Sequence, residues 1–337
     1  MSEVSMIGLD LAKNFIQAHG ANTTGAVLFR KKLRRAELVP FLAAQAPCVV
    51  AMEACAGAHH VARAAAQLGH TARIAPAHYV KPFAKRGKSD RIDADAVIEA
   101  AQRPSMRFVP VKSIEQQAAA SVFRTRDLIV RQRTMSINAL RGQLAEYGLI
   151  APKGLAHVGE LVTLIAAAPE AARVCLRLLA DNIAAFDAQI KRLDGEIARR
   201  AKADETARRL MTIPGCGPVF ATAFLALAPA PQNFRRGRDF AAWVGLTPLP
   251  DGTGGKDRVG KTSKMGERTL RRLLMLGAAS RVRQALRSGA AGDPWLARML
   301  AEKPRMLVIT ALANRMARIA WAVAASGEVY RSSARGG

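Results

Sequence analysis

The sequence lacks several features that would assign it to a familiar class. Its four cysteines are scattered without CxxC spacing, which argues against a disulfide framework or a zinc ribbon and fits a reducing cytoplasm. No uninterrupted run of about 18 apolar residues occurs; the nearest, 306–325, contains Asn314, Arg315 and Arg318. The first residues show no basic segment followed by an apolar one, so we expect no secretory signal. These absences favour a cytoplasmic, globular protein.

Acidic residues are scarce relative to basic ones. The chain of 337 residues has 26 Asp and Glu against 51 Lys and Arg, a formal net charge of +25. Such an excess calls for a polyanionic partner, with nucleic acid the first choice and a membrane surface the weaker one. Aromatic residues make up only 5 %, which argues against base stacking as the main binding mode. We therefore expect contacts to the phosphate backbone.

The first hundred residues alternate short apolar runs with helix-like segments. Strands are expected at residues 4–9, 16–19, 26–29, 48–52 and 71–74, and helices at 58–68 and 90–102. Strands followed by helices predict an α/β sheet, which binds ligands at the carboxyl ends of its strands.

Four carboxylates fall where such a sheet would form a site. Asp10 and Glu53 each follow an apolar run, whereas Asp90 and Asp93 lie three residues apart at the start of a helix and so share a face. For Asp90 and Asp93 alone, solvated surface charge is the plain alternative. A carboxylate at the end of a buried strand, however, must be paired, metal-bound or at the edge of the sheet. The set predicts an oxygen-ligand site for a divalent cation.

Neighbouring residues offer rival ligands. Asp95 is acidic too, but helical geometry turns it away from the face of Asp90 and Asp93. His59 and His60 follow Cys55 closely, yet no further His or Cys pair completes a zinc set.

The middle of the chain is helical and basic. Residues 113–145 and 171–201 predict two long helices, and the apolar spacing of the second fits a helical hairpin or a coiled coil. Next, Ile213-Pro214-Gly215-Cys216-Gly217 precedes an apolar helix at 219–227, which is a helix-hairpin-helix-like pattern. Its glycines allow a backbone to approach a phosphate at a helix N-terminus.

A glycine-rich basic segment, 251–266, leads into a helix expected at 267–285. It lacks the GxxxxGK[ST] spacing of a triphosphate-binding loop. A flexible linker is the plain alternative, and a solvated helix face is the alternative for the arginines between 124 and 141. We expect nucleic acid to be bound by Gly215, Gly217, Lys256, Arg258, Lys261, Lys264, Arg271, Arg124 and Arg131.

Six motifs, in order, give the chain a resemblance to a known family over nearly its whole length. They are Gly8-Leu9-Asp10-Leu11-Ala12-Lys13, Met52-Glu53-Ala54, Lys88-Ser89-Asp90-Arg91-Ile92-Asp93-Ala94, Ile213-Pro214-Gly215-Cys216-Gly217, Phe240-Ala241-Ala242-Trp243-Val244-Gly245-Leu246-Thr247-Pro248, and Ser263-Lys264-Met265-Gly266 followed by Leu270-Arg271-Arg272. The chain resembles the DEDD transposases of bacterial insertion sequences.

The resemblance implies three parts and a composite site. The parts are an α/β RuvC-like (RNase H-like) domain at 1–112, a helical or coiled-coil segment at 113–205, and a mainly α-helical transposase domain at 206–330. Asp10, Glu53, Asp90 and Asp93 would bind Mg²⁺ near the scissile phosphate, and a serine after Leu-Thr-Pro would attack DNA. Here Thr253 stands at that position, and no serine occurs between Thr247 and Thr262. Its β-methyl group crowds an in-line attack, so either Thr253 acts or this copy is impaired.

The resemblance also implies partners. These are donor and target double-stranded DNA, a non-coding bridge RNA that guides recombination, and further copies of the chain in a dimer or tetramer. A metal-dependent resolvase-type nuclease without a covalent intermediate is the alternative enzyme. A non-enzymatic basic DNA-binding protein is the third possibility.

Overall fold

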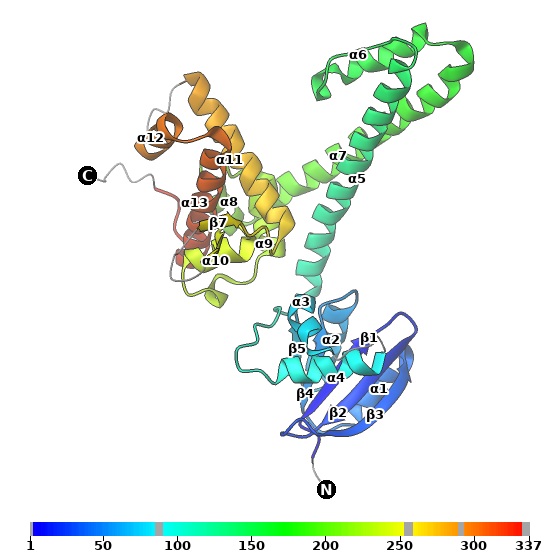
Figure 1. Ribbon diagram of the computed structural model, residues 1–337, viewed down its shortest axis with the longest axis vertical. Coiled ribbons are helices and arrows are strands. Elements are labelled where there is room, and N and C mark those ends of the chain that lie inside the picture. The colour runs from blue at the N-terminus through cyan, green and yellow to red at the C-terminus, as the bar shows by residue number, and fades with distance from the viewer. Residues whose placement is uncertain (1–2, 85–89, 253–258, 289–292, 332–337) are drawn as a thin grey trace. The chain divides into compact units, whose positions relative to one another are not determined.

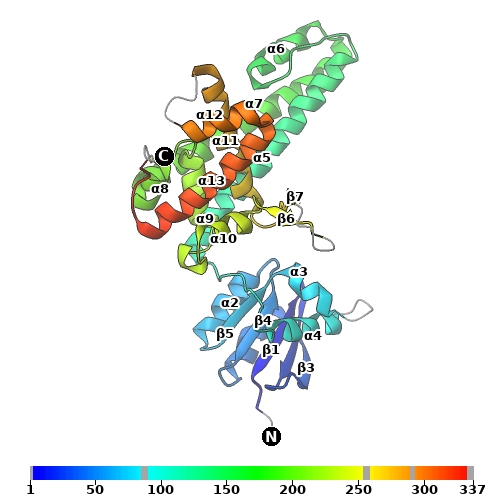
Figure 2. The ribbon, with the colours of Figure 1, turned by 60° about the vertical axis from the view of Figure 1, so that its left-hand side comes forward.

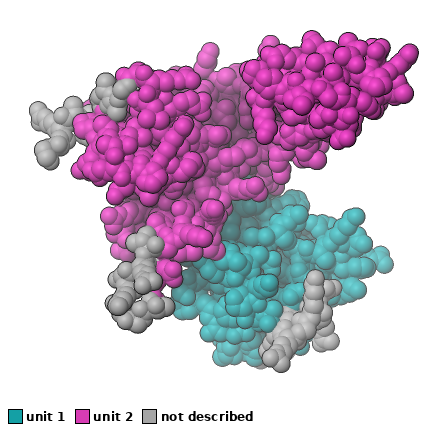
Figure 3. Space-filling model, turned by 45° about the horizontal axis from the view of Figure 1, so that its top comes forward, with its two compact units in different colours: residues 1–114 teal, residues 115–337 magenta. Residues whose placement is uncertain are grey.

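The computed structural model describes residues 3–84, 90–252, 259–288 and 293–331. It comprises two compact units, residues 1–114 and 115–337, coloured separately in Figure 3. Thr253, Lys256 and Arg258 lie outside the described residues, and so does the side chain of Asp90. An α/β sheet in the first unit and a mostly helical second unit confirm the expected fold class in outline (Figure 1).

Unit 1 is built on a five-stranded sheet with the order β3-β2-β1-β4-β5. Its strands are β1 (Met6–Leu11), β2 (Phe15–Ala21), β3 (Val27–Arg34), β4 (Val49–Glu53) and β5 (Thr71–Ala75). β1 pairs antiparallel with β2 and parallel with β4. β3 extends five residues past the expected end at residue 29, because its basic side chains hide the apolar alternation that would indicate a strand.

Helices cover both faces of this sheet. They are α1 (Leu38–Ala43), α2 (Ala58–Gln67), α3 (Ala77–Val80) and α4 (Asp90–Ala101), with 3₁₀ turns η1 (Arg35–Glu37) and η2 (Lys81–Phe83). Ile7 and Leu9 of β1 pack with residues of α1 and α2 in one apolar cluster. Met6 packs with Val97 and Ile98 of α4 in another. The sheet is thus the middle of three layers.

Unit 2 begins with an antiparallel pair of long helices, which run side by side in Figures 1 and 2. They are α5 (Ile114–Ala145) and α7 (Glu170–Ala203), with α6 (Val158–Thr163), η3 (Leu155–His157) and η4 (Leu164–Ala167) between them. Ion pairs join Arg126 to Asp194 and Arg133 to Asp187, an order that fixes the antiparallel direction.

The remainder of unit 2 is a helical core with one small hairpin. The elements are α8 (Glu205–Met211), α9 (Pro218–Leu227), η5 (Pro231–Asn233), α10 (Gly237–Val244), β6 (Pro248–Pro250), β7 (Val259–Thr262), α11 (Arg268–Ser288), α12 (Pro294–Glu302) and α13 (Arg305–Ser326). Phe123 of α5 and Ile197 of α7 are buried in the same cluster as Phe240 and Leu274. The start of α5 and the end of α7 therefore pack into this core.

Among the described helices, α13 is long and apolar enough to cross a membrane by length and composition alone. Its small apolar side chains, Ala313, Ala317 and Ala320, are fully buried in the unit 2 core. The helix packs against α10 and α11. Its apolar composition is thus accounted for by core packing.

Candidate active site

Asp10 and Glu53 lie on neighbouring parallel strands and point to the same face of the sheet. Leu9 pairs with Met52, so the two carboxylates follow at adjacent positions. Met6 of β1 and Ala51 of β4 pack in the cluster under α4. Because side chains alternate along a strand, Asp10 and Glu53 share that face.

Helix α4 brings Asp93 to the same end. A Cβ atom at Gly8 would lie 2.8 Å from the carbonyl oxygen of Ala94 and 2.5 Å from Cγ1 of Ile98, so α4 crosses β1 directly over this glycine. Burial raises the pKa of Glu53, and the charge of Asp93 raises it further. Asp93 is therefore close enough to Glu53 for the two carboxylates to repel each other.

The pKa of the Cys55 thiol also responds to the nearby carboxylates. Burial raises its pKa, Glu53 and Asp10 raise it further, and Arg35 lowers it. We call Asp10, Glu53 and Asp93 the carboxylate cluster. Among the described residues, no three His, Cys, Asp or Glu side chains lie close enough to hold one metal ion, and the side chain of Asp90 is not among them. Asp10, Glu53 and Asp93 thus lie near the same ends of β1 and β4, but their side chains are not arranged as a ligand set for one ion.

Two of the rival ligands, Asp95 and His59, make other contacts. Asp95 accepts hydrogen bonds from Nδ1 of His19 at 2.7 Å and from Arg30 at 3.1 Å. Burial would raise the pKa of Asp95, but these two partners outweigh it and lower the pKa. His59 Nδ1 accepts the backbone N–H of Lys112 at 3.2 Å. Asp95 thus attaches α4 to β2 and β3, a role that the sequence alone did not reveal.

In unit 2, two distant motifs meet beneath the β6–β7 hairpin. Gly245 and Gly266 have φ values of 80° and 85°, which favour glycine. A Cβ at Gly245 would lie 1.9 Å from the carbonyl oxygen of Met265, and one at Gly266 would lie 1.7 Å from that of Trp243. The ends of the segment that carries Thr253 are therefore fixed to α10 and to the start of α11.

Three residues that the sequence predicts to bind nucleic acid lie near the packed glycines Gly245 and Gly266, which we call the junction. Arg271 donates from Nη1 to the carbonyls of Val244 at 2.8 Å and Met265 at 3.0 Å, which ties it to the junction itself. Burial lowers its pKa, and Arg268 lowers it further. Lys264 has a left-handed φ of 53°, a conformation that costs a side-chain-bearing residue about 1 kcal/mol. The side chains of Lys264 and Lys261 are exposed.

Comparisons with known proteins match both regions. A family model described as "Transposase IS116/IS110/IS902 family" matches residues 207–291, and a DEDD transposase model of IS110 elements matches residues 7–149. The chain belongs to this transposase family.

Relatives extend the match to the full chain. A protein of Pseudomonas aeruginosa named "Probable family 20 transposase" is 43 % identical over 97 % of this chain and 99 % of its own length. The "Transposase for insertion sequence element IS1328" of Yersinia enterocolitica is 39 % identical over 98 % and 99 %. The y4pF/y4sB protein of Sinorhizobium fredii is 41 % identical over 99 % of this chain and 87 % of its own length.

In the transposase, the helix-hairpin-helix-like turn has two different glycines. Gly215 has a φ of 90° and packs on α11, where a Cβ at Gly277 would lie 2.2 Å from the Gly215 carbonyl oxygen. Cys216 is buried, which raises its pKa to about 12. Gly217 is the N-cap residue of α9 and has open space around its Cβ position. Both glycines are exposed, but Gly215 is needed for packing, whereas a Cβ at Gly217 would meet nothing within 4 Å.

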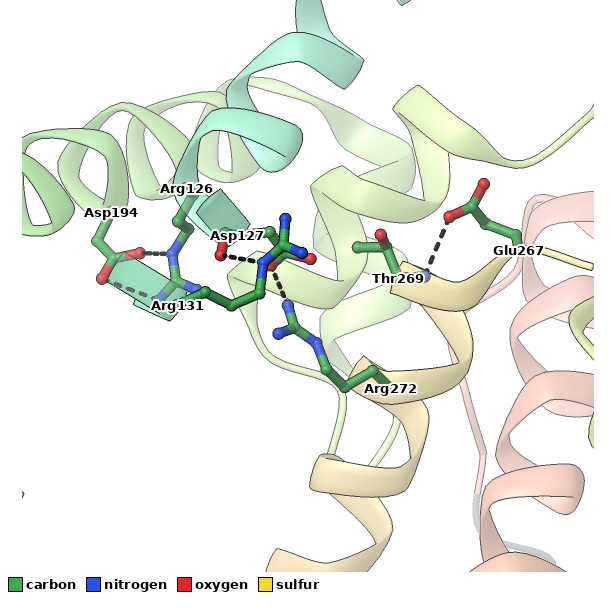
Figure 4. A network of polar contacts seen from close by, with 7 residues as sticks. All are labelled: Arg126, Asp127, Arg131, Asp194, Glu267, Thr269 and Arg272. Atoms are coloured by element: carbon green, nitrogen blue, oxygen red, sulfur yellow. Dashed lines mark hydrogen bonds and ion pairs between the residues drawn. The ribbon is translucent and has the colours of Figure 1, made fainter. Parts of the chain in front are cut away.

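The arginines of α5 also divide into two kinds. Figure 4 shows Asp127 between Arg131, whose Nε donates to the Asp127 carbonyl at 3.3 Å, and Arg272 of α11, which pairs with its carboxylate. Arg126 binds Asp194 of α7 through two hydrogen bonds. Arg124 is exposed. The Arg272 pair fastens α11 to α5, a structural role that the motif Leu270-Arg271-Arg272 did not predict.

Proposed function

We propose that this transposase cuts and rejoins DNA strands at a Mg²⁺ site formed by Asp10, Glu53, Asp90 and Asp93. The observation that supports it most is the carboxylate cluster, where Glu53 is held against the repulsion of Asp93. Oxygen ligands of this kind suit a divalent cation, which would relieve the repulsion. When bound, Mg²⁺ supplies Lewis-acid polarisation of a phosphoryl oxygen.

The nucleophile in this proposal is the hydroxyl group of Thr253. The hydroxyl gives up its proton as its oxygen attacks the phosphorus of the scissile phosphodiester and forms a threonine–phosphate bond, while the bridging DNA oxygen leaves and takes up a proton to become a hydroxyl group. Attack by another DNA hydroxyl on this intermediate restores the threonine and joins the strands. The fixed junction at Gly245 and Gly266 supports this role, because it anchors both ends of the segment.

The remaining residues of the proposal bind nucleic acid. Gly217, Lys261, Lys264 and Arg124 are exposed and suited to phosphates, as the sequence predicts for Lys256 and Arg258. Gly215, Arg131 and Arg271 also make contacts within the fold. Donor and target DNA, a non-coding guide RNA and a dimer or tetramer in the cytoplasm complete the proposal.

A metal-dependent nuclease is the second candidate. One observation favours it: a threonine stands where the resemblance implies a serine, and a β-branched side chain is a poorer nucleophile. In that reaction water attacks the phosphorus, and no covalent intermediate forms.

A trapping assay separates the two. The full chain, RNA transcribed from the flanks of its element, Mg²⁺ and end-labelled donor and target DNA are mixed, denatured with detergent and separated on a gel. Wild type is compared with Thr253→Ala, Thr253→Ser and Asp10→Asn.

Recombination through Thr253 predicts a labelled protein–DNA band that is lost in Thr253→Ala and Asp10→Asn and is retained or stronger in Thr253→Ser. Cleaved DNA without attached protein, unchanged in Thr253→Ala, would replace the proposal by the hydrolytic nuclease. Bound but uncut DNA in all four proteins would contradict both enzymes.

A further inference from the structure

A row of basic side chains runs along the edge of the unit 1 sheet towards the carboxylate cluster. Five of the six residues 30–35 are Lys or Arg. Their strand, β3, is the edge strand beside β2. Arg34 pairs with Phe15, and Leu11 pairs with Ile16, so β3 ends at the edge of the sheet where β1 ends.

Three of these side chains alternate onto the face that carries α4. Arg30 reaches Asp95 of α4, whereas Leu33 packs in the apolar cluster on the opposite face. Lys32 and Arg34 therefore share the face of Arg30, and of the carboxylate cluster, at a spacing of about 7 Å.

The basic residues that follow Arg30 in this row have charges that a ligand could contact. Arg30 is paired with Asp95. Lys32 places Nζ 4.4 Å from the ring centroid of Phe15. Within the described part of the chain, Lys32, Arg34 and Arg35 form no ion pair with a carboxylate. All three are exposed.

Arg35 extends the row to the strand ends themselves. Its Nη1 donates to the carbonyl of Ala12 at 3.1 Å, and Ala12 is two residues beyond Asp10. A Cβ at Gly57, four residues beyond Glu53, would lie 2.8 Å from its Nη2. The carboxylate of Glu37 accepts the backbone N–H of Arg34 at 2.7 Å, which fixes the turn from β3 into η1. The guanidinium group is thus held beside the ends of both β1 and β4.

We propose that Lys32, Arg34 and Arg35, the basic strip, bind the backbone of the DNA strand that is cut and that Arg35 contacts a phosphate beside the scissile one. This inference rests on the proposed function, in which the DNA strand is cut at the carboxylate cluster. Three carboxylates repel DNA, and cations beside them offset that repulsion. A guanidinium group offers paired, planar donors that match a phosphate. DNA rather than RNA is the expected occupant because the strip leads to the carboxylates.

The first test is the salt dependence of DNA binding by the full chain. The Kd for a labelled duplex is measured in EDTA between about 50 and 200 mM salt, for wild type, Lys32→Gln, Arg34→Gln and the double variant. Arg107→Gln is the control, because Arg107 is exposed and lies two residues before Val109, which pairs with β5 at the opposite edge of the sheet. Thermal unfolding checks that each variant folds.

The strip predicts that the slope of log Kd against log salt falls by about 1 for each lost cation and by about 2 in the double variant. Slopes equal to those of wild type and Arg107→Gln would overturn the proposal. The same measurement is made with an RNA duplex of matched length. A smaller slope for the variants with RNA but not with DNA would also overturn the proposal.

The second test concerns Arg35. Arg35→Gln should lower the rate of DNA cleavage at saturating DNA by about 10²-fold, with partial recovery in Arg35→Lys and a smaller effect on Kd. An unchanged rate would overturn the assignment of Arg35. If the wild-type protein binds DNA but never cuts it, the proposed function is overturned. The salt dependence of Kd would still show whether the basic strip binds DNA.

Discussion

At the residue scale, the repulsion between carboxylates in the cluster lowers the stability of the fold. Glu53 is partly buried at the end of β4, and the charge of Asp93 opposes its ionisation. A group whose folded pKa is raised is unfavourable to folding above that pKa, and the cost disappears as the pH falls through it. If the carboxylates bind Mg²⁺ as proposed, the bound cation would relieve this cost.

Glu53→Gln should therefore stabilise the metal-free protein at neutral pH, by less than about 1 kcal/mol because the site is partly exposed. The same change should abolish DNA cleavage. Thermal unfolding in EDTA measures the first effect, with Glu99→Gln on α4 as control. A lower melting temperature for Glu53→Gln than for that control would contradict the repulsion.

The pKa of Asp95 is shifted in the opposite direction from that of Glu53. Its hydrogen bonds with His19 and Arg30 lower its pKa, so their contribution is complete above the ordinary pKa of an aspartate, 3.8, and is lost as the pH falls through the folded value. The side chain is 39 % exposed, which moderates the gain.

Asp95→Asn should accordingly cost about 1 kcal/mol at pH 7, and the difference from wild type should shrink once the pH is well below 3.8. Urea unfolding at neutral and acid pH measures it. A difference that grows towards acid pH would show that Asp95 does not act through its charge.

At the element scale, the close packing of α4 on β1 determines where Asp93 lies. The sequence predicts α4 and most of the strands well because each has a clear apolar period or an abrupt end, but it misses the second half of β3, where basic side chains hide that period. It does not predict that Gly8 is the crossing point or that Asp95 is attached to His19, since both depend on contacts between segments far apart in the chain. The same limit applies to Arg35, whose partners, Ala12 and Gly57, follow different strands.

Gly8→Ala should disturb this packing. The added Cβ would lie 2.8 Å from the backbone oxygen of Ala94, which cannot rotate away, so α4 must shift. We expect a loss of about 1–3 kcal/mol and a lower cleavage rate. Gly142→Ala in α5, where nothing lies within 4 Å, is the control and should be neutral or slightly stabilising. Equal stability and activity of both variants would refute the close crossing.

At the scale of the whole molecule, the two units contribute different chemistry. Unit 1 supplies the carboxylate cluster and, by our inference, the basic strip. Unit 2 supplies the fixed junction on either side of Thr253 and an ion-paired attachment of α11 to α5. The sequence predicts that Asp10 and Glu53 lie at the ends of strands and that Asp93 lies near the start of a helix, and the structure places them there. That these residues form the catalytic site stays a prediction. The motifs do not distinguish residues that we propose to bind nucleic acid alone from those, such as Arg271, that also hold the fold together.

The most direct test of the account is the Mg²⁺ dependence of DNA cleavage by the full chain. The initial rate on labelled DNA containing the ends of its element is measured over a range of Mg²⁺ concentrations for wild type, Asp10→Asn and Glu99→Gln. We predict a rate that saturates with Mg²⁺ in wild type and Glu99→Gln and falls at least about 10³-fold in Asp10→Asn at every concentration. Cleavage by Asp10→Asn at the wild-type rate, or by wild type in EDTA, would contradict it.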